Sequence, residues 1–148
     1  MTKYSSIENS LYLCAQAKNI IFKYRNKSLM KKTLVLGASP NPLRFSNKMV
    51  KSLVRHGYEA IPLGIRQGEI IGIDILTGKP DLKDIHTVSL YLSPKRQEEY
   101  YDYIISLEPK RIIFNPGTHN QEFINLARNN DIEAITDCAL IMIAKDIY

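Results

Sequence analysis

The stretch Thr33-Leu-Val-Leu-Gly-Ala-Ser-Pro-Asn-Pro-Leu-Arg-Phe-Ser46 decides the fold of this chain. Residues 34–36 form an unbroken apolar run, which is typical of a strand covered on both faces in a parallel sheet. Gly37 ends the run where a tight turn is easiest. Ser46 is a candidate N-cap and predicts a helix over residues 47–56. The stretch therefore predicts a strand, a loop and a helix, in that order.

The loop between this strand and this helix has the chemistry of an anion site. Ser39 and Asn41 offer side-chain hydrogen bonds, and Pro40 and Pro42 stiffen the backbone. The first amide groups of a helix lack partners inside the helix and carry the positive end of its dipole. The spacing departs from the Gly-x-Gly-x-x-Gly fingerprint, because Ser39 stands at the second glycine position. The loop predicts a bound phosphate group, and the alternative is a structural turn that binds nothing.

Length and composition restrict the class of protein. A chain of 148 residues with 45% hydrophobic residues fits one domain with an appendage and supplies ample core. No apolar run is long enough to cross a membrane and the N-terminus lacks a signal-peptide pattern, so we expect a cytoplasmic protein with no membrane partner. Cys14 and Cys138 lie far apart without metal-ligand spacing, so the sequence predicts neither a disulfide framework nor a metal site.

The net charge of +5 is concentrated in the leader, which we define as residues 1–29. The leader holds five basic residues and one acidic residue, whereas the rest of the chain holds 15 basic and 14 acidic residues. A nearly neutral domain without a strand rich in arginine and aromatic residues argues against binding to nucleic acid. We therefore divide the chain into a basic extension, residues 1–29, and a nucleotide-binding domain, residues 30–148.

The leader has the pattern of an amphipathic helix. Ser5-x-x-Glu8 is a capping box, and apolar residues follow at helical spacing. These apolar residues are Leu13, Ala17, Ile20 or Ile21, and Tyr24. The pattern predicts a helix that packs on the domain or on a protein partner, and an extension with no part in the chemistry is the alternative.

The domain alternates strands and helices. We expect further strands at residues 59–63, 85–92, 110–115 and 132–136, and helices after each of the last three strands. Residues 67–80 predict a short hairpin or an extended segment on the rim of the sheet. A strand, helix and strand within about 30 residues open a doubly wound sheet. The predicted fold is a three-layer, doubly wound Rossmann-like α/β fold with a mainly parallel five-stranded sheet and an N-terminal helical extension.

The tip of the second predicted strand discriminates between nucleotide ligands. A classical NAD site places Asp or Glu there to hold the ribose hydroxyls. This chain has Pro62-Leu-Gly-Ile-Arg66, which contains no carboxylate. Arg66 is a candidate partner for a ribose phosphate, which favours coenzyme A (CoA) or NADP over NAD. A solvated loop cation is the alternative interpretation of Arg66.

Two residues near the expected crevice could support chemistry. Ligands of doubly wound sheets bind beyond the carboxyl ends of the strands, where the loop that begins at Pro116-Gly117 should face the Gly37 loop. His119 belongs to that loop, but no Ser, Cys or carboxylate partner stands at a defined spacing from it. Cys138 is typical of a small core residue, with thiol chemistry toward a ligand as the alternative. We therefore predict no catalytic residue.

Four parts of the chain together resemble a known family. These are the loop Gly37-Ala-Ser-Pro-Asn-Pro42, the helix end His56-Gly-Tyr58, the strand tip Ile61-Pro62, and the late Asp137-Cys138. They resemble the small stand-alone CoA-binding domain proteins, which are Rossmann-like and similar to the CoA-binding domain of the succinyl-CoA synthetase alpha subunit. The resemblance covers about residues 30–143 and implies a CoA or acyl-CoA ligand.

The resemblance also implies a distribution of roles along the ligand. It implies that the pyrophosphate is cradled by Gly37, Ala38, Ser39 and Asn41, with Arg44 or Ser46 assisting. The adenosine end would be bordered by Pro62, Leu63, Gly64 and Arg66, and the adenine or pantetheine wall would be Tyr91, Leu92 and Ser93. Pro116 and Gly117 complete the predicted cofactor-binding residues. The chain departs from the family where Asn115-Pro-Gly-Thr-His119 replaces a Gln-Gly type turn, and where no basic residue stands between Asp137 and Cys138.

The sequence thus predicts a CoA-binding or acyl-CoA-binding module without catalytic activity. One alternative is an NADP-dependent oxidoreductase or another nucleotide-using enzyme. A second alternative is an interaction protein that recruits a partner through the leader.

Overall fold

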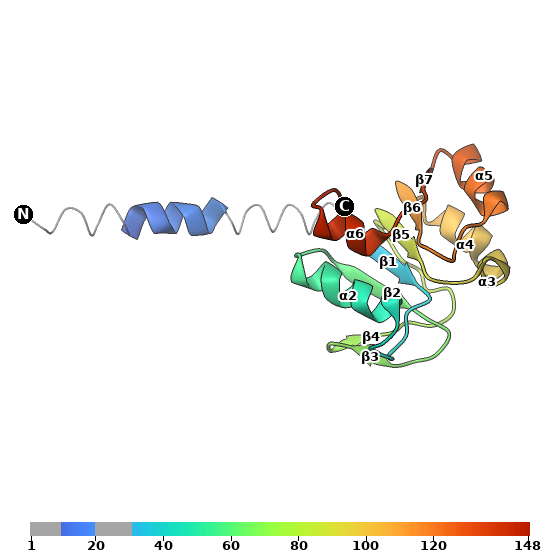
Figure 1. The fold of residues 1–148 in the computed structure, drawn as a ribbon, viewed down its shortest axis with the longest axis horizontal. Coiled ribbons are helices and arrows are strands. Elements are labelled where there is room, and N and C mark those ends of the chain that lie inside the picture. The colour runs from blue at the N-terminus through green and yellow to red at the C-terminus, as the bar shows by residue number, and fades with distance from the viewer. Residues whose placement is uncertain (1–9, 20–30) are drawn as a thin grey trace, which may run out of the picture.

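The computed structural model describes residues 10–19 and 31–148. The main sheet has five strands in the order β2-β1-β5-β6-β7, and every neighbouring pair is parallel (Figure 1). The strands are β1 (Thr33–Leu36), β2 (Ala60–Leu63), β5 (Thr87–Leu90), β6 (Arg111–Phe114) and β7 (Glu133–Ile135). The chain passes from β1 to β2 and then returns to the other side of β1. The topological switch point, where such sheets bind ligands, therefore lies between β1 and β5.

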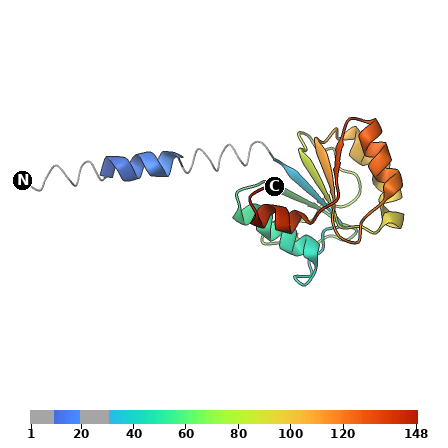
Figure 2. The same ribbon diagram turned by 45° about the horizontal axis from the view of Figure 1, so that its top comes forward.

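Helices cover both faces of this sheet (Figure 2). They are α2 (Phe45–Arg55), α3 (Pro94–Gln97), the 3-10 helix η1 (Glu98–Tyr100), α4 (Tyr101–Ser106), α5 (Gln121–Asn129) and α6 (Ala139–Ala144). Val35 of β1 packs in one core cluster with residues of α2 and α6, whereas Leu34 and Leu36 pack in the other with residues of α4 and α5. This alternation confirms the predicted three-layer, doubly wound arrangement, because neighbouring residues of a strand point to opposite faces.

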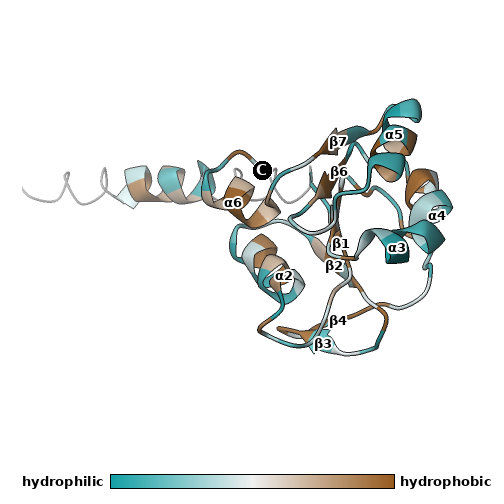
Figure 3. Cartoon of the chain, turned by 45° about the vertical axis from the view of Figure 1, so that its right-hand side comes forward, coloured by the Kyte–Doolittle hydropathy of each residue, from teal (hydrophilic) through white to brown (hydrophobic). Residues whose placement is uncertain are grey.

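The distribution of hydropathy agrees with this layering. All four residues of β1, β5 and β6 are buried, and Figure 3 shows apolar residues along β6 and polar residues over α3. Helix α5 buries Phe123, Ile124 and Ala127 against the sheet. In the described residues, no helix is long and apolar enough to cross a membrane.

The predicted hairpin is a small antiparallel pair at the edge of the main sheet. Its strands are β3 (Glu69–Ile70) and β4 (Ile73–Asp74). The chain then returns to β2, where the amide of Leu76 donates to the carbonyl of Pro62 at 2.9 Å and the amide of Gly64 donates to the carbonyl of Leu76 at 2.9 Å. This return segment fixes the position of the loop that follows β2.

One predicted helix boundary is wrong, and one predicted helix is interrupted. Helix α2 begins at Phe45 with Arg44 as its N-cap, and Ser46 is a buried residue of the first turn. The chain turns into the helix before Ser46, because the Asn41 side chain accepts a hydrogen bond from the amide of Leu43 at 2.9 Å. The helix expected after the strand at residues 85–92 is present but is interrupted by η1, between the buried Gln97 of α3 and the start of α4.

The described part of the leader agrees with the predicted helix. Residues 10–19 are helical and all ten are exposed, including Leu13 and Ala17. The capping box of Ser5 and Glu8 and the apolar residues at positions 20, 21 and 24 lie outside the described residues.

Candidate functional site

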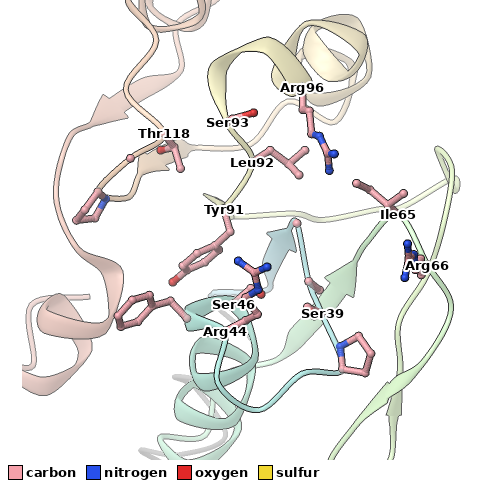
Figure 4. A pocket seen from close by; sticks show the side chains of 16 residues that line it. Ser39, Arg44, Ser46, Ile65, Arg66, Tyr91, Leu92, Ser93, Arg96 and Thr118 are labelled. Atoms are coloured by element: carbon pink, nitrogen blue, oxygen red, sulfur yellow. The ribbon is translucent and has the colours of Figure 1, made fainter.

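A cavity of about 640 Å³ opens at the carboxyl ends of β1, β2, β5 and β6 (Figure 4). Its position is the switch point of the sheet, and its volume lies within the range of small-molecule sites. The cavity is lined by Gly37, Ala38, Ser39, Pro40, Arg44, Phe45, Ser46, Ile65, Arg66, Tyr91, Leu92, Ser93, Arg96, Pro116, Gly117 and Thr118.

The first two residues of the β1–α2 loop are tied to β2. The amides of Gly37 and Ala38 both donate to the carbonyl of Leu63, at 2.8 and 3.0 Å. Gly37 has a φ of +96°, and a Cβ atom there would lie 2.9 Å from the carbonyl carbon of Tyr91. Both residues line the cavity, but their amide hydrogens are already used. They shape the floor of the cavity through close packing between β1 and β5.

Short-range hydrogen bonds hold the rest of this loop. The Ser39 hydroxyl accepts from the amide of Asn41 at 3.2 Å and keeps its own hydrogen for another acceptor. The side chain of Asn47, which is 2% exposed, donates to the carbonyl of Ser39 at 2.9 Å. Ser39 therefore faces the cavity from a braced backbone, whereas Asn41 braces the loop from outside the cavity lining.

The start of α2 offers unused amide groups to the cavity. Arg44 makes no side-chain cap, and within the described residues no acceptor bonds the amides of Phe45, Ser46 and Asn47. These amides carry the positive end of the dipole of an eleven-residue helix. An anion that reaches the first turn of α2 would satisfy them.

Three arginines approach the cavity from three different elements. Arg44 stands at the N-cap position of α2, Arg66 follows β2, and Arg96 belongs to α3 (Figure 4). Figure 4 places Arg66 and Arg96 on the same side of the cavity as Ile65. The sixteen lining residues include no Asp or Glu, so the wall has a net positive charge at neutral pH. A ligand with several negative charges complements such a wall.

The opposite side of the cavity is neutral. Residues 91–93 follow β5 and residues 116–118 follow β6, and neither segment contains a charged side chain. The Tyr91 hydroxyl oxygen is buried and has no hydrogen-bond partner in the described part of the chain, so the ring rather than the hydroxyl meets the cavity. Burial raises the pKa of Tyr91 well above its usual value. Tyr91 is therefore neutral at physiological pH.

Buried amide side chains hold the loops of this neutral side. Gln97 is fully buried and donates to the carbonyl of Leu92 at 2.9 Å and to the carbonyl of Thr118 at 2.8 Å. Its own carbonyl oxygen accepts from the Asn120 side chain at 3.1 Å. One side chain therefore joins the loop after β5 to the loop after β6.

Asn115, directly after β6, also joins separate parts of the chain. Its side chain donates to the Ser89 hydroxyl and to the carbonyl of Leu90, both at 2.9 Å, and accepts from the amide of Ala139 at 2.9 Å. The last bond positions the start of α6. Where the family commonly has a Gln-Gly type turn, this chain therefore has a structural residue, Asn115, which connects β5, β6 and α6.

Ten of the fourteen predicted ligand residues line the cavity, and four do not. Asn41 braces the loop, while Pro62, Leu63 and Gly64 are buried behind it. A Cβ atom at Gly64 would lie 2.4 Å from the carbonyl oxygen of Ala38, so Gly64 is required for packing against the β1–α2 loop. The lining from this part of the chain comes instead from Ile65 and Arg66, because the strand ends at Leu63 and the chain then turns outward.

Sequence reasoning missed several lining residues. Pro40, Phe45, Ile65, Arg96 and Thr118 line the cavity without having been predicted, and Ser93 was named only as part of a wall. The Ser93-Pro94 helix start was a usable signal for Arg96, because a residue in the first turn of the following helix lies at the same edge of the sheet.

The two candidates for chemistry do not line the cavity. His119 is exposed and Cys138 is half-buried. The backbone amide of Cys138 donates a hydrogen bond to the Asp137 carboxylate at 2.7 Å. Within the described residues, no group of three His, Cys, Asp or Glu side chains is arranged to hold a metal ion.

The fold and the site define a Rossmann-like domain that presents a positively charged cavity at its switch point. The family model described as CoA binding domain matches residues 31–144. The chain belongs to this family of CoA-binding domains. None of the curated proteins matches the chain.

Solved structures show the same fold. A crystal structure of an uncharacterized protein is 42% identical, with a TM-score of 0.79 over 80% of this chain and 98% of that chain. A hypothetical protein from Pyrococcus horikoshii OT3 is 27% identical, with a TM-score of 0.72 over 84% of this chain and 89% of that chain. The dinucleotide-forming acetyl-coenzyme A synthetase 1 of Ca. Korarchaeum cryptofilum is 13% identical, with a TM-score of 0.60 over 75% of this chain and 27% of that chain, and shares the fold alone.

Proposed function

We propose that this protein binds CoA or acyl-CoA reversibly as a non-catalytic module. The observation that carries the proposal is the combination of three arginines, an uncapped helix start and no carboxylate in the wall of one cavity. Membership of the CoA-binding domain family supports the same ligand.

In this proposal the pyrophosphate lies at the start of α2. The Ser39 hydroxyl and the free amides of Phe45 and Ser46 donate hydrogen bonds to it. The Arg44 guanidinium neutralises part of the negative charge of the pyrophosphate. Gly37 and Ala38 contribute shape and not hydrogen bonds, because their amides bond Leu63.

The adenosine end lies on the side of β2. Arg66 and Arg96 are both exposed there, and each can pair with the phosphate that CoA carries on its ribose. The tip of β2 offers no carboxylate to ribose hydroxyls, which disfavours NAD. NADP carries a comparable ribose phosphate and is the competing ligand.

The absence of catalysis is proposed from the composition of the wall. None of the sixteen lining residues is a His, Cys, Asp, Glu or Lys, so no group in the wall titrates near neutral pH. Tyr91, the lining residue with a phenolic hydroxyl, keeps its proton because burial raises its pKa. The wall is equipped to bind and orient a ligand.

The proposal is tested by thermal melting of the full chain with CoA, dephospho-CoA, NAD and NADP in parallel. A ligand at about 100 times its Kd adds about 2.7 kcal/mol to the stability, which corresponds to a rise of about 5–10 °C in Tm. We expect the largest rise with CoA and a smaller one with dephospho-CoA. No rise with CoA, or an equal rise with NAD, would contradict the proposal.

A charge substitution in the loop tests the placement of the pyrophosphate. Ser39→Glu places a negative charge where the phosphates should lie, so we expect the Kd for CoA to rise at least about tenfold. Thr77→Glu is the matched control, because Thr77 is exposed and lies outside the cavity lining but its substitution changes the net charge equally. Equal affinities in the two variants would place the phosphates elsewhere.

A further inference from the structure

Two large apolar side chains on the cavity wall are exposed. Phe45 is 65% exposed and Ile65 is 57% exposed. Single exposed apolar residues are common on protein surfaces, but both of these line the site. Ile65 precedes Arg66 on the cationic side, where it can pack against a nucleoside (Figure 4). Phe45 lies at the start of α2 and needs a separate explanation.

Phe45 continues the buried stripe of α2 into the cavity. Phe45, Met49 and Leu53 recur every four residues and therefore lie along one face of the helix. Met49 and Leu53 are fully buried in the core cluster that includes Met142 of α6. Phe45 comes one turn earlier, beyond the carboxyl end of β1, where no strand covers it. The Lys48 ammonium lies 5.0 Å from the centroid of its ring, and in the described part of the chain the rest of the ring is an exposed apolar surface.

The neutral side of the cavity has room beside its apolar groups. Tyr91 presents its ring to the cavity, and Pro116 is exposed in the loop after β6. A methyl group added at Gly117 would meet no atom within 4 Å, so the space beside that backbone is open. This side therefore combines apolar surface, free space and an absence of charge.

We infer that the neutral side takes the acyl group of an acyl-CoA, and that the ligand class is thioesters with short apolar acyl groups in preference to free CoA. The inference rests on the proposed function, because the arginines orient the ligand with its nucleotide toward β2. The pantetheine arm then crosses Tyr91, and the acyl chain covers Phe45 and Pro116. Each methylene that is buried there tightens binding about fourfold.

The experiment is isothermal titration of the full chain with CoA, acetyl-CoA, butyryl-CoA and hexanoyl-CoA. We expect the Kd to fall from CoA to butyryl-CoA by at least about tenfold. Phe45→Ser keeps the backbone amide of residue 45, and it should raise the Kd for butyryl-CoA about tenfold more than it raises the Kd for CoA. Because Phe45 is largely exposed, this variant should keep the Tm of the parent chain.

Two further variants serve as controls. Leu43→Ser changes a residue that is 79% exposed on the same loop but does not line the cavity, so every Kd should stay unchanged. Ile65→Ser lies on the nucleotide side and should weaken CoA and its thioesters by the same factor. Only the Phe45 variant should alter the ratio of the two affinities.

The outcomes separate this inference from the proposed function. Equal Kd values for CoA and butyryl-CoA would overturn the acyl preference while leaving CoA binding in place. A Phe45→Ser variant that weakens CoA and butyryl-CoA equally would also overturn it. If neither CoA nor any thioester binds, the proposed function fails and this inference fails with it.

Discussion

The two walls of the cavity are built in different ways. The β1–α2 wall is held largely by short-range bonds, such as those from Asn41 to Ser39 and from Leu43 to Asn41. The wall formed by the loops after β5 and β6 is held by long-range bonds, in which Gln97 reaches Thr118 and Asn115 reaches Ala139. A binding loop can thus be shaped by its own sequence or by partners from distant parts of the chain.

Two asparagines provide the sharpest test of this difference. Asn115→Ala removes three buried hydrogen bonds and leaves their partners unsatisfied, so we expect a loss of about 3 kcal/mol in the free energy of unfolding. Asn41→Ala removes one exposed local bond and should cost less than about 1 kcal/mol. Chemical denaturation of both variants measures the two costs. Similar losses would show that the two walls do not differ in this respect.

A substitution at Gly64 tests the contact between the end of β2 and the β1–α2 wall. In Gly64→Ala the new Cβ atom would lie 2.4 Å from the carbonyl oxygen of Ala38, which is backbone and must shift. We expect a loss of about 2 kcal/mol in stability and weaker binding of CoA, because the shift displaces the Ser39 loop. Gly78→Ala is a control that isolates backbone strain from steric overlap, since Gly78 has a φ of +75° but a Cβ atom there would meet nothing within 4 Å. Undiminished stability and CoA affinity in Gly64→Ala would refute the role of this contact.

The smallest expected effect concerns Tyr91 and alkaline pH. Burial raises the pKa of Tyr91, so the folded protein holds the phenolic proton more tightly than the unfolded chain does. The resulting stability is fully present below pH 10, the usual pKa of tyrosine, and is lost as the pH rises above it. Tyr91→Phe should therefore reduce the alkaline loss of stability and change the stability at pH 7 by less than about 1 kcal/mol.

Denaturation at pH 7 and pH 11 measures this difference. Tyr12→Phe is the control, because Tyr12 is 64% exposed in the helix of residues 10–19. An identical alkaline loss in the parent chain and in Tyr91→Phe would show that Tyr91 titrates as freely in the folded state as in the unfolded chain.

Sequence reasoning predicted the strand, turn and loop of the β1–α2 wall for a physical reason. The run at residues 34–36, the turn at Gly37 and the polar loop around Ser39 depend on side chains that are neighbours in the chain. It placed the start of α2 two residues late, because the bend made by Asn41 competed with the expected cap at Ser46. It assigned Gly37 and Ala38 to the phosphates without knowing that Leu63 uses their amides.

The hydrogen bonds of the wall formed by the loops after β5 and β6 could not be predicted in this way. No sequence pattern around Gln97 or Asn115 indicates that each side chain bonds a residue more than 20 positions away. The expectation that Pro62, Leu63 and Gly64 border the ligand placed the strand tip at the cavity, whereas the tertiary structure buries these residues and turns Ile65 and Arg66 into it.

The sequence by itself determined the α/β class and the doubly wound sheet, because hydrophobic periodicity and turn chemistry act over short distances. The CoA-binding domain family was indicated by the resemblance of four motifs, and the family model matches residues 31–144. Only the tertiary structure decided which amides stay free, which arginines converge on the cavity and where Phe45 lies beyond the sheet. These properties depend on the register between strands and on the packing of loops from separate βα units, and neither is encoded in a local pattern.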